Sequence, residues 1–121
     1  NWFENKAILW VIALKEEPEM MIGNITFWRI DAEHKRAELG YILSPDYWQQ
    51  GIMQEAAKPV IEYGFKKMNL HGIEAHINPE NKGSEHLLQK MGFQKEAHFT
   101  ENYYYESKFY DSAIYCLQNP G

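Results

Sequence analysis

The apolar and polar residues at the start of this chain are arranged in segments that predict β-strands. Apolar-rich runs at residues 7–15 and 20–29 are separated by the charged sequence Glu16–Glu19, which predicts a β-hairpin. A polar turn at residues 31–35 leads into Arg36–Leu43, where apolar residues alternate with the period of a strand. Three antiparallel strands are therefore expected in this part of the chain.

The middle of the chain predicts a long helix, a strand and a short helix. Apolar residues recur at helical spacing from Gly51 to about Asn69, and Gly72–Asn78 has the composition of a strand. The turn residues that follow, as far as Asn81, start a short helix that Gly92 ends. Two strands joined by a crossover helix normally pair in parallel.

The remainder of the chain predicts a closing pair of aromatic-rich strands, Phe93–Tyr105 and Lys108–Leu117, joined near Glu106 and Ser107. The order of elements is strands, helix, strand, helix, strands. We therefore expect an α+β protein with one mixed, mostly antiparallel sheet and helices packed on it. The 121 residues are enough for a single domain, residues 1–121.

The start of the long helix has no residue suited to capping it. Trp48, Gln49 and Gln50 are poor N-cap residues, so the first backbone amides of the helix have no evident partner in the sequence. Gly51 allows a ligand to approach these amides closely, and the positive end of the helix dipole favours a phosphate. Water is the alternative partner for the same amides.

This segment, WQQGIMQE at residues 48–55, resembles the pyrophosphate-binding loop of the GNAT superfamily of N-acetyltransferases. It is most similar to the Rim-type branch, which includes the ribosomal-protein alanine acetyltransferases, and the resemblance covers about residues 8–117. Gln49 and Gln50 stand where Gly and Lys are usual, so a flexible position and a positive charge are absent. The matching residues are Trp48, Gly51, Ile52, Met53, Glu55 and Ala56.

The resemblance implies a GNAT-like fold in which the strands around the loop splay apart to admit the pantetheine arm of acetyl-CoA. Rim-type proteins also carry a strand and two helices ahead of this region, which implies that a front portion is missing, in a fragment or a naturally short form. From its pattern alone, Asn81 is the cap of the short helix. The residues implied to bind acetyl-CoA are Tyr41, Ile42, Leu43, Gln49, Gln50, Gly51, Ile52, Met53, Asn78, Asn81 and Ser84.

Acetyl transfer to an amine requires a grip on the carbonyl oxygen and a way to obtain a neutral amine. As in the family's corresponding strand, the backbone amides of residues 41–43 are expected to hold the oxygen. Glu38 is the candidate base, acting directly or through water, and the alternative is a solvated carboxylate paired with Arg36 or Lys35. An α-amine, with a pKa of about 7.7–8.0, can react with a weaker base than a lysine side chain, whose pKa is about 10.4.

Two further residues are candidates for proton transfer. Glu101 is the second candidate acid, because an acidic residue from the closing strands takes part in some Rim-type enzymes, although the position that aligns is Tyr103. Rim-type members carry an Asn-x-x-Ser motif, present here as Asn81 and Ser84, and the resemblance makes the serine the acid for thiolate release. The alternative for Ser84 is a hydrogen bond to a carbonyl of the preceding turn.

Composition narrows the possible partners. The net charge of −5, with scattered Lys and Arg, argues against nucleic-acid binding and suits cationic amines. The apolar run Ala7–Leu14 is too short to span a membrane, so we expect a cytoplasmic protein. The single cysteine, Cys116, excludes an internal disulfide and is expected to be buried in the last strand. His71 and His76 lack partners at ligand spacing, so no metal is expected.

These observations lead to the hypothesis of an acetyl-CoA-dependent N-acetyltransferase that acts on a protein N-terminal α-amine by direct attack. A small-molecule amine acetyltransferase and a CoA-binding module without turnover are the alternatives. His76 either lines the acyl pocket or makes a local hydrogen bond. The last aromatic residues are expected to pack on the sheet, or else to form a homodimer face or a substrate wall; they are Tyr103, Tyr104, Tyr105, Phe109 and Tyr110.

Overall fold

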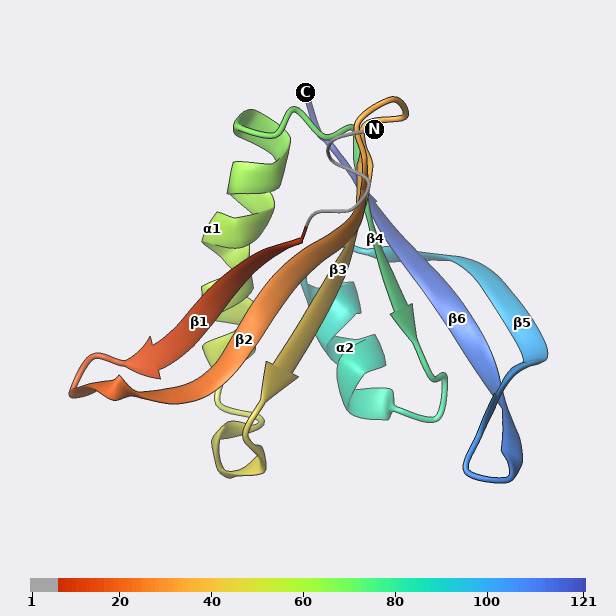
Figure 1. Cartoon of the computed structure of the whole chain (residues 1–121), viewed down its shortest axis with the longest axis horizontal. Helices are drawn as coiled ribbons and strands as arrows, with labels where there is room; N and C mark the ends of the chain where they lie inside the picture. Colours follow the sequence, from red (N-terminus) through yellow and green to blue (C-terminus); the bar gives the residue numbers. More distant parts are fainter. Residues whose placement is uncertain (1–6) are drawn as a thin grey trace.

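The computed structural model describes residues 7–121, which form a six-stranded sheet with two helices against it (Figure 1). Neither helix in this range is long and apolar enough to cross a membrane. In chain order the elements are β1 (Ile8–Leu14), β2 (Glu17–Asp31), β3 (Arg36–Leu43), a 3-10 turn (Pro45–Tyr47), α1 (Ile52–Lys66), β4 (Gly72–Ile77), α2 (Lys82–Lys90), β5 (Gln94–Tyr105) and β6 (Lys108–Gln118).

The strands lie in the order β1-β2-β3-β4-β6-β5, and within the described sheet only β3 and β4 pair in parallel. This pair consists of three register positions, Arg36 with Gly72, Ala37 with Ile73, and Glu38 with Glu74. Beyond them the two strands diverge, as Figure 1 shows. The expected mixed sheet with a splayed parallel pair is confirmed, because α1 forms the crossover between β3 and β4.

The first hairpin differs in detail from the expected one. Its turn is Lys15–Glu16, whereas the sequence pattern predicted a turn over Glu16–Glu19. Pro18 therefore lies within β2, which a proline tolerates only where its missing N–H is not needed. Here β2 pairs with β1 alone, since its pairing with β3 begins only at Gly23.

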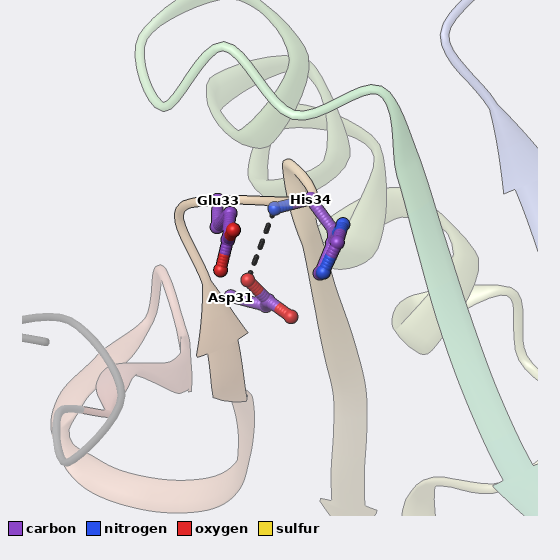
Figure 2. Close-up of side chains that lie close together, drawn as sticks. All are labelled: Asp31, Glu33 and His34. Carbon is purple, nitrogen blue, oxygen red and sulfur yellow. Dashed lines mark hydrogen bonds between the residues drawn. The ribbon is translucent and has the colours of Figure 1, made fainter.

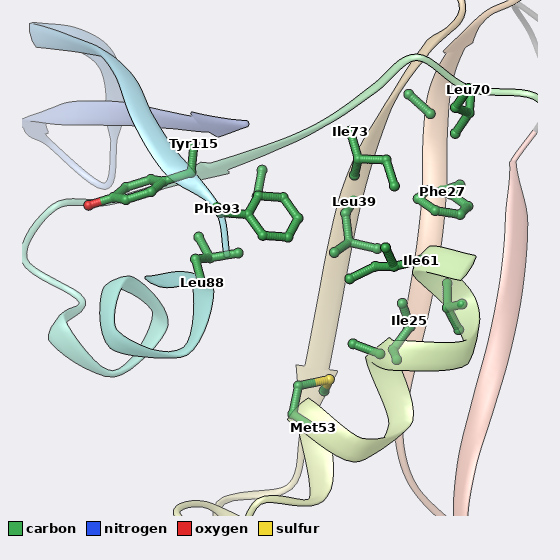
Figure 3. Close-up of a cluster of buried hydrophobic side chains, with 14 of the residues drawn as sticks. Ile25, Phe27, Leu39, Met53, Ile61, Leu70, Ile73, Leu88, Phe93 and Tyr115 are labelled. Atoms are coloured by element: carbon green, nitrogen blue, oxygen red, sulfur yellow. The ribbon is translucent and has the colours of Figure 1, made fainter. Parts of the chain in front are cut away.

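The core fills the space between the sheet and the two helices (Figure 3). Phe27 is fully buried against α1, and a Cβ added to Gly64 of that helix would lie 2.9 Å from the Phe27 ring. On the other side of the gap, Leu88 of α2 is fully buried near Phe93 and Tyr115, as Figure 3 shows. Each such side chain contributes about 1.5–3 kcal/mol on burial. This packing fixes β3 and β4 relative to the two helices.

The β5–β6 hairpin turns at Glu106 and Ser107, as predicted, and both residues adopt positive φ. This is typical of a two-residue hairpin turn. The aromatic side chains near its tip pack on each other across the hairpin, with ring centroids 5.5 Å apart for Tyr103–Tyr110 and 5.0 Å apart for Tyr104–Phe109. Four of them, Tyr103, Tyr104, Tyr105 and Phe109, remain exposed, so they lie outside the hydrophobic core.

Candidate acyl-CoA site

A cavity of about 290 Å³ opens where β3 and β4 separate. The first turns of α1 and α2 lie at the same end of the sheet (Figure 1). The starts of two helices and several polar side chains therefore lie together at the wide end of the gap. The cavity is lined by Leu39, Gly40, Tyr41, Ala75, His76, Ile77, Asn78, Asn81 and Ser84.

The backbone of β3 beside the cavity is paired on one side only. Residues Leu39–Leu43 pair with β2, but the register with β4 ends at Glu38. Because backbone groups of alternate strand residues point to opposite edges, part of this stretch presents N–H and C=O groups to the gap. Tyr41, Ile42 and Leu43 thus lie at a strand edge that β4 does not cover, and their contact with CoA stays a prediction.

The loop after β3 is held by two of its own side chains. The Trp48 indole donates from Nε1 to the Leu43 carbonyl at 2.7 Å, and the Gln50 amide donates from Nε2 to the Asp46 carbonyl at 3.1 Å. Gln49 adopts a φ of 61°. The two glutamines thus shape the turn, and Gln50 uses its side chain to close the loop.

The start of α1 is open, as the sequence predicted. Gly51 is the N-cap residue with a φ of 77°, and within residues 7–121 no side chain caps this helix. A Cβ at Gly51 would meet no atom within 4 Å other than those of its chain neighbours, so the space beside this glycine is open. Met53 is buried in the core, so it can offer a ligand only its backbone N–H. Together these features suit an anion at the helix start.

The start of α2 is capped by its own side chains. Asn81 Oδ1 accepts a hydrogen bond from the Ser84 backbone N–H at 3.0 Å, which confirms the capping role expected from the pattern. Asn78 Oδ1 similarly accepts from the Glu80 N–H at 2.9 Å. Asn78, Asn81 and Ser84 also line the cavity, so their predicted contact with CoA remains available to them.

Tyr41 adds a feature that sequence reasoning missed. Its hydroxyl is buried and has no hydrogen-bond partner in the part of the chain that the structure describes. Burial raises the pKa of the Tyr41 hydroxyl, and the neighbouring Ser84 hydroxyl opposes part of that rise. The alternation that placed Tyr41 on the apolar face of β3 was the available signal, but it did not reveal an unpaired hydroxyl.

Glu38 lies at the narrow end of the gap in an unexpected environment. Its side chain is buried, with the residue 6% exposed, so the alternative of a solvated carboxylate is wrong. Arg36, the expected partner, instead donates from Nε to Glu74 Oε2 at 2.8 Å. Burial raises the pKa of the Glu38 carboxyl, while His76 and Arg29 act in the opposite direction.

His76 lies between two carboxylates. Its Nδ1 is 3.2 Å from Glu38 Oε1 and its Nε2 is 3.1 Å from Glu74 Oε1. The local hydrogen bond expected for His76 is present, with Glu74 as its partner, and His76 also lines the cavity. Its contact with an acyl group stays a prediction. The parallel register, with Glu38 opposite Glu74, brings these three side chains together on one face of the sheet.

Glu101, the second candidate acid, does not line this cavity. It lies at an irregularity in β5 with a φ of 45°, and its backbone N–H donates to Asp111 Oδ1 at 2.8 Å. His98 Nε2 is 2.8 Å from the other oxygen of Asp111. Cys116, as predicted, is a buried free cysteine in β6, and burial raises the pKa of its thiol.

The turn between β2 and β3 brings together Asp31, Glu33 and His34 (Figure 2). Their potential ligand atoms lie within 4.8 Å of one another, and the cluster includes neither His71 nor His76, the histidines considered from the sequence. The His34 backbone N–H donates to Asp31 Oδ1 at 3.0 Å, which is an ordinary turn contact. We assign no metal to this exposed turn, and the expectation of a metal-free protein stays a prediction.

Comparison with known proteins agrees with this geometry. Residues 1–94 match the family model described as an acetyltransferase (GNAT) domain. YoaA of Bacillus subtilis, an uncharacterized N-acetyltransferase, is 36% identical over 117 residues, which are 97% of this chain and 66% of that protein. A spermidine N(1)-acetyltransferase of Vibrio cholerae is 27% identical over 107 residues, which are 88% of this chain and 62% of that protein.

A solved structure extends the comparison to three dimensions. The ribosomal-protein-S5-alanine acetyltransferase of Vibrio fischeri superimposes with a TM-score of 0.87 at 30% identity, over 94% of this chain and 62% of that one. The arrangement of strands and helices is therefore that of a GNAT acetyltransferase. The chain spans less than two thirds of the length of these relatives.

Proposed function

The chain belongs to the acetyltransferase (GNAT) domain family, and from this premise we propose that it transfers an acetyl group from acetyl-CoA to a primary amine. The observation that carries the proposal is the start of α1, which no side chain caps in the described part of the chain, with open space beside Gly51, at the wide end of the gap between β3 and β4. A helix start of this kind binds phosphates, and an open strand edge binds an extended amide-containing chain.

The residues at the site fit acetyl-CoA in three parts. The N–H groups of Ile52 and Met53 would bind the diphosphate, in a loop whose shape Gln49, Gln50 and Gly51 determine. Tyr41, Ile42 and Leu43 would hold the pantetheine arm through their backbone groups. Asn78 and Asn81 would contribute from the opposite wall of the cavity. When bound, acetyl-CoA supplies an acyl group that is activated as a thioester.

Two side chains would assist the transfer. Glu38 would accept the proton of the attacking amine, directly or through one water, and its burial raises the pKa of its carboxyl towards the range useful for a base at neutral pH. Ser84, on the opposite wall, would donate a hydrogen bond to the departing thiolate. The backbone N–H groups of residues 41–43 would stabilise the charge that develops on the carbonyl oxygen.

The proposed acceptor is the α-amine of a protein N-terminus. Such an amine is about a tenth neutral at pH 7 because its pKa is about 7.7–8.0, so a single buried carboxylate is an adequate base. The structural likeness to the ribosomal-protein-S5-alanine acetyltransferase of Vibrio fischeri supports this class of acceptor. We also propose that the protein works without a metal and acts in the cytoplasm.

A polyamine is the second candidate acceptor. A spermidine N(1)-acetyltransferase is among the sequence relatives, and the net charge of −5 favours cationic substrates. The third possibility is a module that binds CoA without turnover, since Gln50 occupies the position where the family usually has a positive charge.

Thiol release from acetyl-CoA separates these functions. The acceptors are a peptide with a free N-terminal alanine, the same peptide with a blocked N-terminus, and spermidine. We expect turnover with the free peptide alone, and turnover with spermidine alone would favour the second candidate. Binding without turnover, unchanged by Glu38→Gln or Ser84→Ala, would identify a CoA-binding module. No heat of binding and no thermal protection at millimolar acetyl-CoA would overturn the proposal.

A further inference from the structure

The side chains of Glu38, His76 and Glu74 form a continuous array across the narrow end of the gap. Glu38 Oε1 is 3.2 Å from His76 Nδ1, and His76 Nε2 is 3.1 Å from Glu74 Oε1. Arg36 fixes the far end of the array, since its Nε donates to Glu74 Oε2 at 2.8 Å. The array thus runs from a buried carboxylate to a half-exposed one, with side-chain exposures of 7% and 28%.

The array lies where the reaction is proposed to occur. The Glu38–Glu74 step is the last register position of the parallel pair, and the cavity begins immediately beyond it. His76 borders the cavity, whereas Glu38 and Glu74 do not. His76 therefore connects the wall of the cavity to both carboxylates.

The buried carboxylate of Glu38 requires a hydrogen-bond donor such as His76. Its Oε1 atom is buried and makes no hydrogen bond of good geometry among residues 7–121, and its other cationic neighbour, Arg29 Nη1, is 3.7 Å away. A buried carboxylate without a nearby donor is unfavourable, and small movements of the ring would complete the bond from His76 Nδ1. With both nitrogens next to carboxylates, a protonated ring would donate to both at once.

We propose that His76 is a positioning residue that links Glu38 to the Arg36-anchored Glu74 and thereby sets the pH range in which Glu38 accepts a proton from the acceptor amine. This inference rests on the proposed function and assigns a role that the sequence motifs do not contain. The charged groups that face Glu38 are Arg29 on β2, and His76 and Glu74 on β4. Arg29 and His76 favour the ionised carboxylate, whereas Glu74 opposes it.

The role of His76 predicts the sign of a change in the pH profile. Removing the imidazole in His76→Gln removes a group that lowers the pKa of Glu38, so a larger fraction of Glu38 is protonated at a given pH. In the pH profile of kcat/KM, the acidic limb then moves to higher pH. The value of kcat/KM falls by about tenfold below the midpoint and changes little at the alkaline plateau. KM for acetyl-CoA is expected to stay constant.

The matched control is His98→Gln. His98 also contacts a carboxylate, with Nε2 2.8 Å from Asp111 Oδ2, but it lies on β5 and does not line the cavity. The His98→Gln variant is expected to have the same pH profile as the wild type. A limb that does not move in His76→Gln, or that moves equally in His98→Gln, would overturn the role of His76.

A second measurement tests whether Glu38, His76 and Glu74 contact one another, and it does not require turnover. In the protein labelled at histidine nitrogens, NMR is expected to show that Glu38→Gln changes mainly the Nδ1 shift of His76, whereas Glu74→Gln changes mainly the Nε2 shift. The carboxyl carbon of Glu38 is expected to titrate at higher pH in His76→Gln. A His76 ring that ignores both substitutions would overturn the array.

The two measurements separate this inference from the function on which it rests. If the wild type releases no thiol with any acceptor, the proposed function fails and the role of His76 in proton acceptance fails with it. The ring shifts would still establish or refute the array itself. If turnover is present and the ring shifts respond, but the limb in His76→Gln stays in place, only the role of His76 is wrong.

Discussion

Arg36 donates from Nε to Glu74 Oε2 at 2.8 Å and so joins β3 to β4 next to the point where they separate. The close fit depends on Gly72, because a Cβ there would lie 2.7 Å from Arg36 Nη1. The same guanidinium reaches Cys116 Sγ at 3.5 Å. One cation therefore connects β3, β4 and β6 beside the candidate site.

Removing this cation is expected to lower stability at neutral pH and to change it less in acid. Burial raises the pKa of Glu74, but the hydrogen bonds from His76 and Arg36 outweigh it, and the net pKa is lowered from 4.5. The stability that Glu74 contributes is present above pH 4.5 and is lost as the pH falls through the folded-state pKa. Arg36→Met should lose about 1–2 kcal/mol at pH 7 and lose less on acidification, as urea unfolding at several pH values can measure.

The control for Arg36→Met is Lys82→Met. This change removes an exposed pair in which Lys82 Nζ lies 3.8 Å from Glu85 Oε1. A pair of this kind contributes little, so stability should change by less than about 0.5 kcal/mol at any pH. Equal losses in the two variants would contradict the importance of the Arg36–Glu74 contact.

Glu38→Gln is expected to stabilise the protein while it impairs catalysis. Burial raises the pKa of Glu38, so its contribution to stability is present below pH 4.5 and is lost as the pH rises through the folded-state pKa. At pH 7 the neutral amide should therefore add about 1 kcal/mol to the free energy of unfolding. Turnover should fall by about 100-fold, the low end of general-base assistance. Destabilisation at pH 7 would mean that the attraction of Arg29 and His76 outweighs burial.

Gly51 tests whether the open helix start binds the diphosphate. Its φ of 77° disfavours most side chains, although the space around it is empty. Gly51→Ala should cost about 1 kcal/mol of stability and weaken acetyl-CoA binding, because the strained turn would redirect the first amides of α1. Gly51→Asn should restore most of both, since asparagine tolerates this conformation. Titration calorimetry with acetyl-CoA, together with thermal unfolding, measures the two effects.

Gln50 tests the effect of the missing positive charge. Gln50→Lys should tighten acetyl-CoA binding by about threefold to tenfold at low ionic strength, and added salt should remove most of the gain. Gln54→Lys is the matched control, because Gln54 is also exposed but lies within α1. A similar gain in both variants would indicate general attraction of the cofactor rather than a contact in the loop.

The sequence predicted the elements beside the gap well, because they depend on local signals. The alternation in Arg36–Leu43 and the glycine at position 51 gave the strand and the helix start directly. The environment of Glu38 was missed because its burial depends on residues far away in the sequence. His76 lies 38 positions further along the chain, and only the parallel register brings it to 3.2 Å. Alternation placed Glu38 on one face of its strand but could not indicate what covers it.

The short parallel register divides the sheet into two three-stranded halves, β1-β2-β3 and β4-β6-β5. Three register positions, together with hydrogen bonds from the His71 and Gly72 N–H groups to the Lys35 carbonyl, join the halves through the backbone in the described part of the chain. One more step of separation would break only one or two backbone hydrogen bonds, each worth about 0.5–1.5 kcal/mol net. The Glu38–Glu74 step is the pivot of this opening. A wider gap would also require Glu38 to separate from His76 and Arg36 from Glu74, so these side-chain contacts, more than the backbone, determine how far the two halves can move apart.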